Sequence, residues 1–181
     1  MRSHTMVVAL AFALSLSGCG KSRDVEVIAA ALEDFTARSD TMPYHESGIT
    51  LIEAQTSKWV QGMGESGAKC VVPKELHDRL VALNDAQRPV APLLATSKKW
   101  RLIQPNDLKG DDPFLFPDKT SAGDSIRTVV RLSIPAYSES GDAALVMFSF
   151  GWSIHSATAR YVLKSSGGSW TVQCSDLFFY V

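Results

Sequence analysis

The sequence has no uninterrupted run of about 20 apolar residues, which is the length that a membrane-spanning helix needs. It also has no excess of basic residues, because 18 Lys and Arg stand against 19 Asp and Glu, and the formal net charge is −1 at pH 7. Contact with nucleic-acid phosphates requires a basic surface, so no nucleic-acid partner is expected. The four histidines show no His-x-x-His or His-Glu-x-x-His spacing, and no metal site is predicted.

Catalytic motifs are missing as well. There is no Gly-x-Ser-x-Gly nucleophile turn, and no pair of acidic residues has a spacing that favours glycoside chemistry. The one local cluster of different titratable side chains is Tyr44-His45-Glu46, and the polarity of an exposed loop explains it. The sequence therefore assigns no catalytic residue and no cofactor.

The first residues carry an export signal. An apolar run of eleven residues, Met6 to Leu16, follows Arg2 and is too short to cross a bilayer. The run ends in Leu16-Ser17-Gly18-Cys19, which resembles the bacterial lipobox. This resemblance implies that residues 1–18 are removed as a signal peptide and that the thiol of Cys19 receives a lipid.

Lipidation of Cys19 implies a lasting membrane anchor. Each buried methylene contributes about 0.8 kcal/mol, so two or three acyl chains hold a protein on a membrane where one chain is marginal. Gly20 follows the cysteine where Asp would retain a lipoprotein at the inner membrane, so the resemblance implies the outer membrane, facing the periplasm. Residues 19–24 are then expected to form a lipidated tether, and 25–181 a single globular domain.

Cys70 and Cys174 remain after Cys19 is lipidated. In an oxidising compartment two thiols often pair, and a bond between them would close a loop of about a hundred residues. The alternative is that both are buried thiols too far apart to meet.

Apolar residues recur every three or four positions in two segments, which predicts amphipathic helices over about 24–38 and 73–84. The first stripe consists of Val25, Ile28, Leu32 and Phe35, and the second consists of Leu76, Leu80 and Leu83. Short strands are expected at 49–52 and 100–103.

The C-terminal third has the patterns of strands. Alternating or continuous apolar residues predict strands over 126–134, 143–150, 160–164, 170–174 and 177–181. Turns are expected at 138–142 and 165–169, and a loop at 151–156. Strict alternation would put Trp170, Val172 and Cys174 on one face of their strand.

This strand-turn-strand region includes Arg131-Leu132-Ser133, Ala144-Leu145-Val146 and Gly168-Ser169-Trp170. It resembles the C-terminal meander of small exported bacterial proteins of unknown function, and many of those proteins carry a cysteine pair that 151–156 lacks. The predicted fold class is α+β, with N-terminal helices packed on a C-terminal antiparallel sheet of four or more strands. This arrangement is similar to the cone of a helix on a curved sheet that is common among small lipoproteins, of the cystatin-like or nuclear-transport-factor-like kind.

The most specific binding motif in the sequence lies in the loop that contains residues 66–69. Ser66-Gly67-Ala68-Lys69 resembles the Ser-Gly-x-Lys/Arg loop of periplasmic lysozyme inhibitors, which place a hydroxyl and a cation near the carboxylates of a glycosidase. This resemblance makes Ser66 and Lys69 a candidate binding loop. The same residues fit the Ser-x-x-Lys pattern of penicillin-recognising acyl enzymes, and Lys119-Thr120-Ser121 is similar to their later Lys-Thr-Gly. The Ser-Asp-Asn element of those enzymes is missing, and the chain is too short for their fold.

Two further patterns are weaker. Residues Gly62 to Gly67 match the spacing of a dinucleotide-binding loop, but Pro73 follows instead of a helix that starts at the glycines. Met42, His45 and Met63 offer soft ligands for copper, although nothing in their spacing requires a metal.

These observations predict a lipid-anchored envelope protein that acts as a non-catalytic binding or envelope-assembly module. Its expected partners are the membrane, through the lipid on Cys19, and another envelope protein. The alternatives are a small periplasmic hydrolase whose site is not apparent from the sequence, or a lysozyme-inhibitor-like protein that uses the Ser66 to Lys69 loop.

Overall fold

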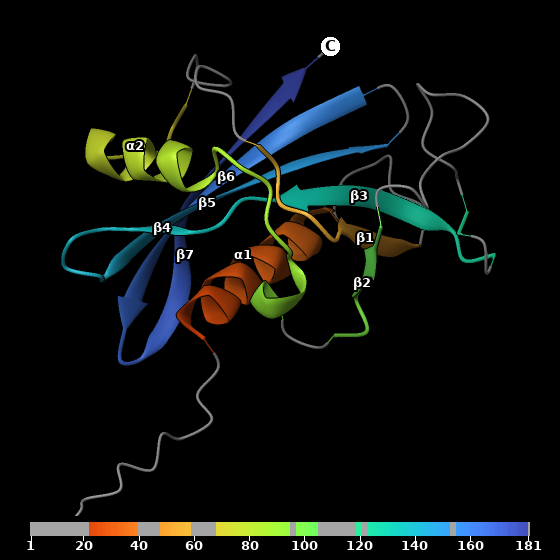
Figure 1. Ribbon diagram of the computed structural model, residues 1–181, viewed down its shortest axis with the longest axis horizontal. Coiled ribbons are helices and arrows are strands. Elements are labelled where there is room, and N and C mark those ends of the chain that lie inside the picture. The colour runs from red at the N-terminus through yellow and green to blue at the C-terminus, as the bar shows by residue number, and fades with distance from the viewer. Residues whose placement is uncertain are drawn as a thin grey trace, which may run out of the picture.

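A computed structural model describes residues 22–39, 48–58, 68–94, 97–104, 119–120, 123–152 and 155–180 (Figure 1). Cys19 and Ser66 lie outside these ranges. The described chain contains two α-helices, one short 3₁₀ helix and a seven-stranded sheet. The helices and strands, in chain order, are α1 (Arg23–Ser39), β1 (Ile49–Glu53), α2 (Lys74–Leu83), η1 (Ala91–Leu93), β2 (Trp100–Ile103), β3 (Ile126–Leu132), β4 (Ala136–Tyr137), β5 (Ala143–Trp152), β6 (His155–Ser166) and β7 (Ser169–Tyr180).

The α+β class is confirmed, but the sheet is mixed rather than wholly antiparallel. Its order is β2-β1-β3-β5-β6-β7, and β4 pairs with β5. β1 is parallel to both of its neighbours, whereas β3 to β7 pair in antiparallel fashion. A parallel pair needs a long crossover, and the chain between β1 and β2 supplies one that contains α2. Both helices precede the antiparallel part of the sheet, β3 to β7, as expected, but β1 and β2 add parallel pairing to the same sheet.

Helix α1 packs on one face of the sheet, as its apolar stripe predicts. Val25, Ile28, Leu32 and Phe35 are all buried. The ring of Phe35 meets those of Phe148 and Phe150 edge-on, with centroids 6.1 and 4.8 Å apart. Burial of aromatic rings in this geometry is worth more than their area alone.

Helix α2 packs on the opposite face. Leu76 and Leu80 contact Leu145 and Met147, which alternate along β5 with the residues that face α1. β5 is thus buried on both faces, as its nearly continuous apolar sequence predicts. The buried side chain of Asn84, which follows α2, donates to the carbonyls of Leu80 and Ile134 and accepts from the N–H of Ile134.

The last two strands are longer than expected. β6 starts at His155, so most of the predicted loop over 151–156 is strand, and the two expected strands at 170–174 and 177–181 form one continuous β7. The tight turn between β6 and β7 is confirmed. Gly167 and Gly168 both have positive φ, 60° and 83°. A two-residue type I′ hairpin turn requires positive φ at both of its central residues.

A register shift in this hairpin separates residues that the sequence pattern placed together. Leu163 pairs with Val172, but Val162 pairs with Cys174, so Gln173 is the extra residue of a bulge. Trp170 and Val172 pack in the core under α1, while Cys174 lies opposite Val162 on the α2 face. The prediction of one shared face is therefore wrong for Cys174.

Candidate functional site

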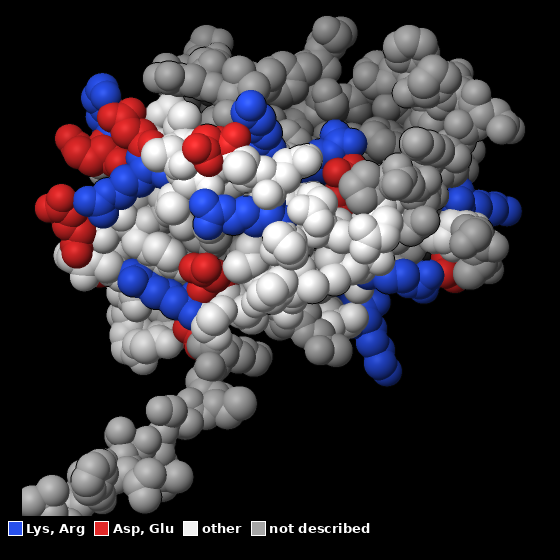
Figure 2. Space-filling view, in the orientation of Figure 1, with Lys and Arg blue, Asp and Glu red and all other residues white. Residues whose placement is uncertain are grey.

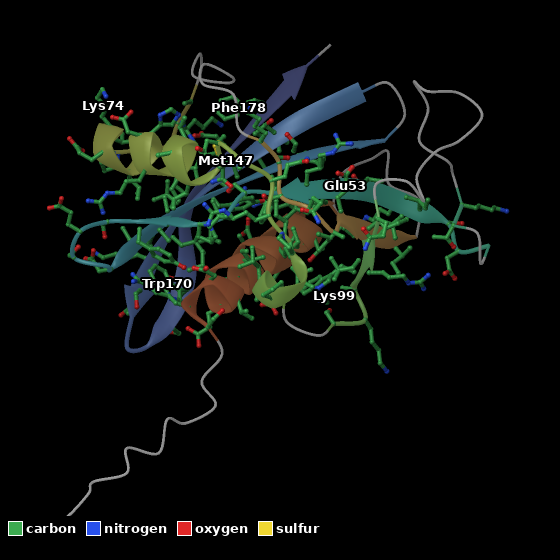
Figure 3. All side chains as sticks on the ribbon, viewed as in Figure 1. Glu53, Lys74, Lys99, Met147, Trp170 and Phe178 are labelled. Carbon is green, nitrogen blue, oxygen red and sulfur yellow. A yellow bond between two sulfur atoms is a disulfide. The ribbon has the colours of Figure 1, made fainter. Side chains whose placement is uncertain are left out.

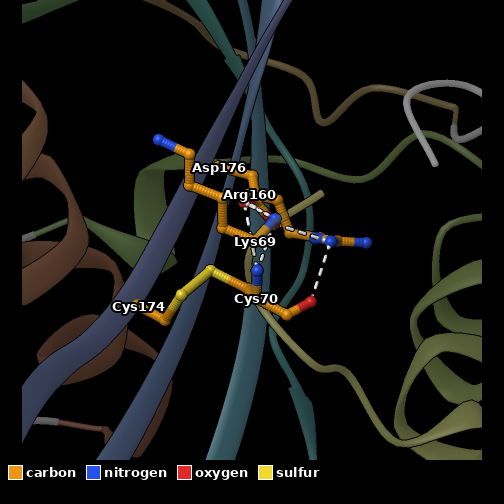
Figure 4. The surroundings of a disulfide bond; sticks show 5 residues. All are labelled: Lys69, Cys70, Arg160, Cys174 and Asp176. Carbon is orange, nitrogen blue, oxygen red and sulfur yellow. Dashed lines mark hydrogen bonds and ion pairs between the residues drawn. A yellow bond between two sulfur atoms is a disulfide. The ribbon is translucent and has the colours of Figure 1, made fainter. Parts of the chain in front are cut away.

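A disulfide joins the chain before α2 to the sheet. Cys70 and Cys174 are bonded, with their Cα atoms 5.7 Å apart and 104 residues apart in sequence (Figure 4). The pairing that the sequence left open is therefore confirmed. In the loop-entropy account, closing a loop of this length stabilises the fold by about 4–5 kcal/mol.

A buried ion pair lies beside the disulfide. Arg160 of β6 and Asp176 of β7 occupy directly opposite positions, and an Arg160 guanidinium nitrogen, Nη2, is 2.6 Å from Asp176 Oδ2. Only 7% of the Arg160 side chain and 3% of the Asp176 side chain are exposed. A buried pair of this kind is expensive to break, because removal of one partner leaves an uncompensated charge in the protein interior.

Both members of the pair also hold the backbone next to the disulfide (Figure 4). Asp176 Oδ1 accepts from the N–H groups of Lys69, at 2.7 Å, and Cys70, at 3.1 Å. Arg160 Nη2 donates to the carbonyl oxygen of Cys70 at 3.2 Å. One carboxylate and one guanidinium thus satisfy three polar groups of a segment that has no strand or helix of its own.

The charged form of Asp176 is favoured in this arrangement. Burial raises the pKa of the Asp176 carboxyl, but hydrogen bonds from Arg160 and from the backbone of Lys69 and Cys70 outweigh burial and hold the pKa below its ordinary value. The guanidinium of Arg160 also lies 5.4 Å from the ring centroid of Phe178, within cation–π range. Its buried Nε has no hydrogen-bond partner among the described residues.

These contacts fix a short exposed segment, Lys69–Val71, which we name the anchored segment. Cys70 is buried, whereas the side chain of Lys69 is exposed and Val71 is 91% exposed. Val72, the next residue, packs against the core under α2. Val71 therefore projects into solvent between two residues that are held in place, which presents an apolar side chain with little freedom of the backbone behind it.

The candidate binding loop is described only at its end. Lys69 belongs to the anchored segment, and its backbone rather than its ammonium contacts Asp176. Ser66, the glycines from 62 to 67, and the proposed copper ligands Met42, His45 and Met63 lie outside the described residues.

The remaining residues singled out from the sequence do not converge on the anchored segment. Lys119 and Thr120 belong to a local turn, in which Thr120 Oγ1 accepts from the N–H of Asp124 at 3.2 Å, and Ser121 is not described. His77 lies on α2, and His155 opens β6, although its side chain is not described. Within the described parts of the chain, no three or more His, Cys, Asp or Glu side chains are grouped as metal ligands would be.

Sequence reasoning missed Arg160 and Asp176. A signal was present, since each is a charged residue inside a segment that otherwise has the composition of a half-buried strand. Their pairing was hidden by the bulge. The two-residue turn pairs Ser166 with Ser169, so an unbroken ladder would place Arg160 opposite Ser175 rather than Asp176.

Charges on the visible surface are mixed in sign. Figure 2 shows acidic and basic side chains interspersed over the end of the molecule that carries α2. Two of the ion pairs there are Lys74 with Asp78, at 2.6 Å, and Arg79 with Glu139, at 3.0 Å. In the described ranges no helix is both long and apolar enough to cross a membrane.

Comparison with known proteins gives no relative: no protein-family model, no curated protein and no solved structure matches this chain. Its function is therefore inferred from its residues and their geometry alone.

Proposed function

We propose that this protein is an exported lipoprotein of the bacterial envelope, anchored through Cys19, that acts as a non-catalytic binding or envelope-assembly module. The lipobox-like Leu16-Ser17-Gly18-Cys19 supports the anchor. The outer membrane, facing the periplasm, is the proposed location, and the cone-like curvature expected of the sheet belongs to the same proposal. The disulfide supports export, because such bonds persist in oxidising compartments and are rare in the cytosol.

The observation that carries the binding role is the anchored segment. Monomeric proteins often expose single apolar side chains, so the exposure of Val71 alone would not indicate a binding site. Here a disulfide, a buried ion pair and three backbone hydrogen bonds hold the segment that displays it. Because a rigid segment loses little conformational entropy when it binds, Lys69 and Val71 are suited to contact a protein partner.

Membrane fractionation tests the anchor. The wild-type protein should sediment with membranes and resist washing with salt, whereas Cys19→Ser should appear in the soluble fraction. Mass analysis of the mature N-terminus should show cleavage before Cys19 and the added acyl chains. An unprocessed N-terminus, or a Cys19→Ser variant that stays on the membrane, would contradict the anchor.

Photo-crosslinking in intact cells tests the binding surface. A benzophenone amino acid at position 71 should form a discrete adduct, and the same amino acid at position 74, where the Lys74 side chain is 82% exposed, should not. Lys69→Glu should weaken the adduct while the fold is kept, since Lys69 contributes only its backbone N–H to Asp176. Equal adducts at 71 and 74, or none at 71, would refute this surface.

Inhibition of a cell-wall glycosidase is the second candidate function. The exposed ammonium of Lys69, on a segment whose backbone is held by Asp176, favours it, because the active sites of such enzymes carry paired carboxylates. Purified protein should slow the clearing of cell-wall suspensions by lysozyme, and Lys69→Ala should abolish the effect. Undiminished clearing at saturating protein concentration would rule this function out.

A further inference from the structure

The start of helix α1 is clamped to one end of the sheet. The guanidinium carbon of Arg23 lies 3.8 Å from the ring centroid of Tyr137 and 5.2 Å from that of Trp170. Arg23 also donates a hydrogen bond to the carbonyl of Gly141, and the hydroxyl of Tyr137 donates to Asp24 Oδ1 at 2.6 Å. The chain therefore enters the fold at a fixed position.

Two turns lie beside this position. The first, 138–142, joins β4 to β5, and the second, 166–169, joins β6 to β7. The N–H of Ser165 donates to the carbonyl of Asp142 at 2.7 Å, so the turns are neighbours. The start of α1 and the turn between β6 and β7 lie at the same end of the molecule in Figure 1. We name the start of α1 together with these two turns the anchor end.

The length of the tether limits how far the anchor end can be from the membrane. Cys19 precedes Arg23 by four residues, and four residues span at most about 14 Å when fully extended. A lipid on Cys19 thus holds the start of α1 within that distance of the headgroup layer. Arg23 contacts Gly141 in the first turn and the ring of Trp170 directly after the second, so the lipid holds these turns close to the headgroup layer as well.

We propose that the anchor end lies against the lipid headgroups and that the anchored segment faces away from the membrane. This orientation rests on the proposed lipid anchor at Cys19.

The chemistry of the anchor end fits a headgroup layer. Trp170 and Tyr137 are partly buried aromatic residues with polar atoms, the kind that is enriched where membranes meet water. Of its acids, Glu139 pairs with Arg79, Asp24 accepts from the hydroxyl of Tyr137, and Asp142 accepts from the hydroxyls of Ser140 and Ser138. These hydrogen bonds, the Ser140 hydroxyl first, lower the pKa of Asp142. Hydroxyls solvate a carboxylate without neutralising it, and Glu26 also lies in the first turn of α1, so the anchor end keeps negative charge. Its fit to a headgroup layer therefore rests on the two aromatic rings and on the hydroxyls of its turns.

The anchored segment lies farther along the same strand. β7 leaves the anchor end at Ser169, and it reaches Cys174 and Asp176 after five and seven residues. At about 3.3 Å per residue, these partners of the anchored segment lie roughly 17–23 Å along the strand. Figure 3 agrees, since Trp170 and Lys74, which follows the anchored segment closely in sequence, are well separated. A partner can thus reach Val71 without meeting the membrane.

Fluorescence quenching in vesicles tests the orientation. Ser166→Cys in the anchor end and Lys74→Cys at the start of α2 each place a single reactive thiol at an exposed position of the full-length lipidated protein. Each variant is labelled with a thiol-reactive fluorophore and reconstituted into phosphatidylethanolamine and phosphatidylglycerol vesicles that contain a lipid with a nitroxide on its headgroup. The label at 166 should be quenched severalfold more than the label at 74. Equal quenching, or stronger quenching at 74, would overturn the orientation.

A longer tether provides the matched control. Twelve Gly and Ser residues inserted between Gly20 and Lys21 keep the lipid but give a flexible span of roughly 22 Å for the sixteen residues. This insertion should bring the quenching at 166 and 74 close together, and an undiminished difference would show that the tether does not set the orientation. If the wild-type protein fails to bind vesicles at all, the lipid anchor itself is wrong, whereas binding with equal quenching refutes only the orientation.

Discussion

Replacement of Asp176 by Asn tests whether the buried ion pair holds the anchored segment on the sheet. The amide oxygen of Asn can still accept from the N–H groups of Lys69 and Cys70, so the main loss is the charge that compensates Arg160. Because both side chains are more than nine-tenths buried, we expect the cost to be about 3–5 kcal/mol, the range for breaking one partner of a buried pair.

Thermal and urea unfolding followed by circular dichroism, with the disulfide intact, measure this cost. At about 2–4 °C per kcal/mol for a chain of this size, the expected loss in Tm is roughly 6–20 °C. Asp78→Asn is the matched control, because it removes the partner of Lys74 from a pair whose side chains are 48% and 82% exposed, and it should cost less than about 1 kcal/mol. If Asp176→Asn is as mild as this control, the reasoning from burial is refuted.

The pH dependence of the same variant checks the charge directly. In the folded protein the pKa of Asp176 lies below its ordinary value, since the hydrogen bonds that it accepts outweigh the effect of burial. The carboxylate therefore stabilises the fold above the unfolded pKa of about 4, and this contribution is lost as the pH falls through the lower folded pKa. The difference in unfolding free energy between wild type and Asp176→Asn should be constant from pH 7 to about 5 and shrink below about 4.

Three further changes have expected outcomes. Cys70→Ala with Cys174→Ala should cost about 4–5 kcal/mol in urea unfolding, and a cost below about 1 kcal/mol would contradict the entropy of a 104-residue loop. Asn84→Ala should cost about 2–3 kcal/mol, because it removes the partner of both the N–H and the carbonyl of Ile134, whereas the carbonyl of Leu80 keeps the backbone N–H of residue 84. Asp85→Ala at the exposed next position should be nearly neutral. Burial, with a hydrogen bond to Asp24 for Tyr137, raises the pKa of the Tyr137 and Tyr161 phenols above the ordinary value of about 10. Stability should therefore fall as the pH rises above about 10, and tyrosinate absorbance should show both rings titrating only as the protein unfolds.

Local periodicity was sufficient to predict the helices and the central strand. α1 and α2 match the predicted ranges within one residue at each end, and β5 is buried on both faces. These features follow from which side chains avoid water along a period of 3.6 or 2 residues, a property that neighbouring residues carry by themselves. The short strands β1 and β2 were also predicted, from their apolar residues.

The direction of pairing was not predictable in the same way. β1 and β2 pair in parallel although 46 residues separate Glu53 from Trp100. Nothing in either short strand distinguishes a parallel neighbour from an antiparallel one, because both ladders use the same backbone groups. The helix between them was the available sign, since parallel strands need a crossover of this kind.

The sequence by itself determined the amphipathic faces of both helices and the presence of Cys70 and Cys174, and it carries the lipobox-like pattern on which the proposed export signal at residues 1–18 rests. Only the tertiary structure decided that Cys174 faces the α2 side and that Arg160 meets Asp176. A bulge at Gln173 makes both happen, because one extra residue reverses the faces of all that follows in β7. That shift depends on how two strands and the chain before α2 fit together, which no stretch of neighbouring residues encodes.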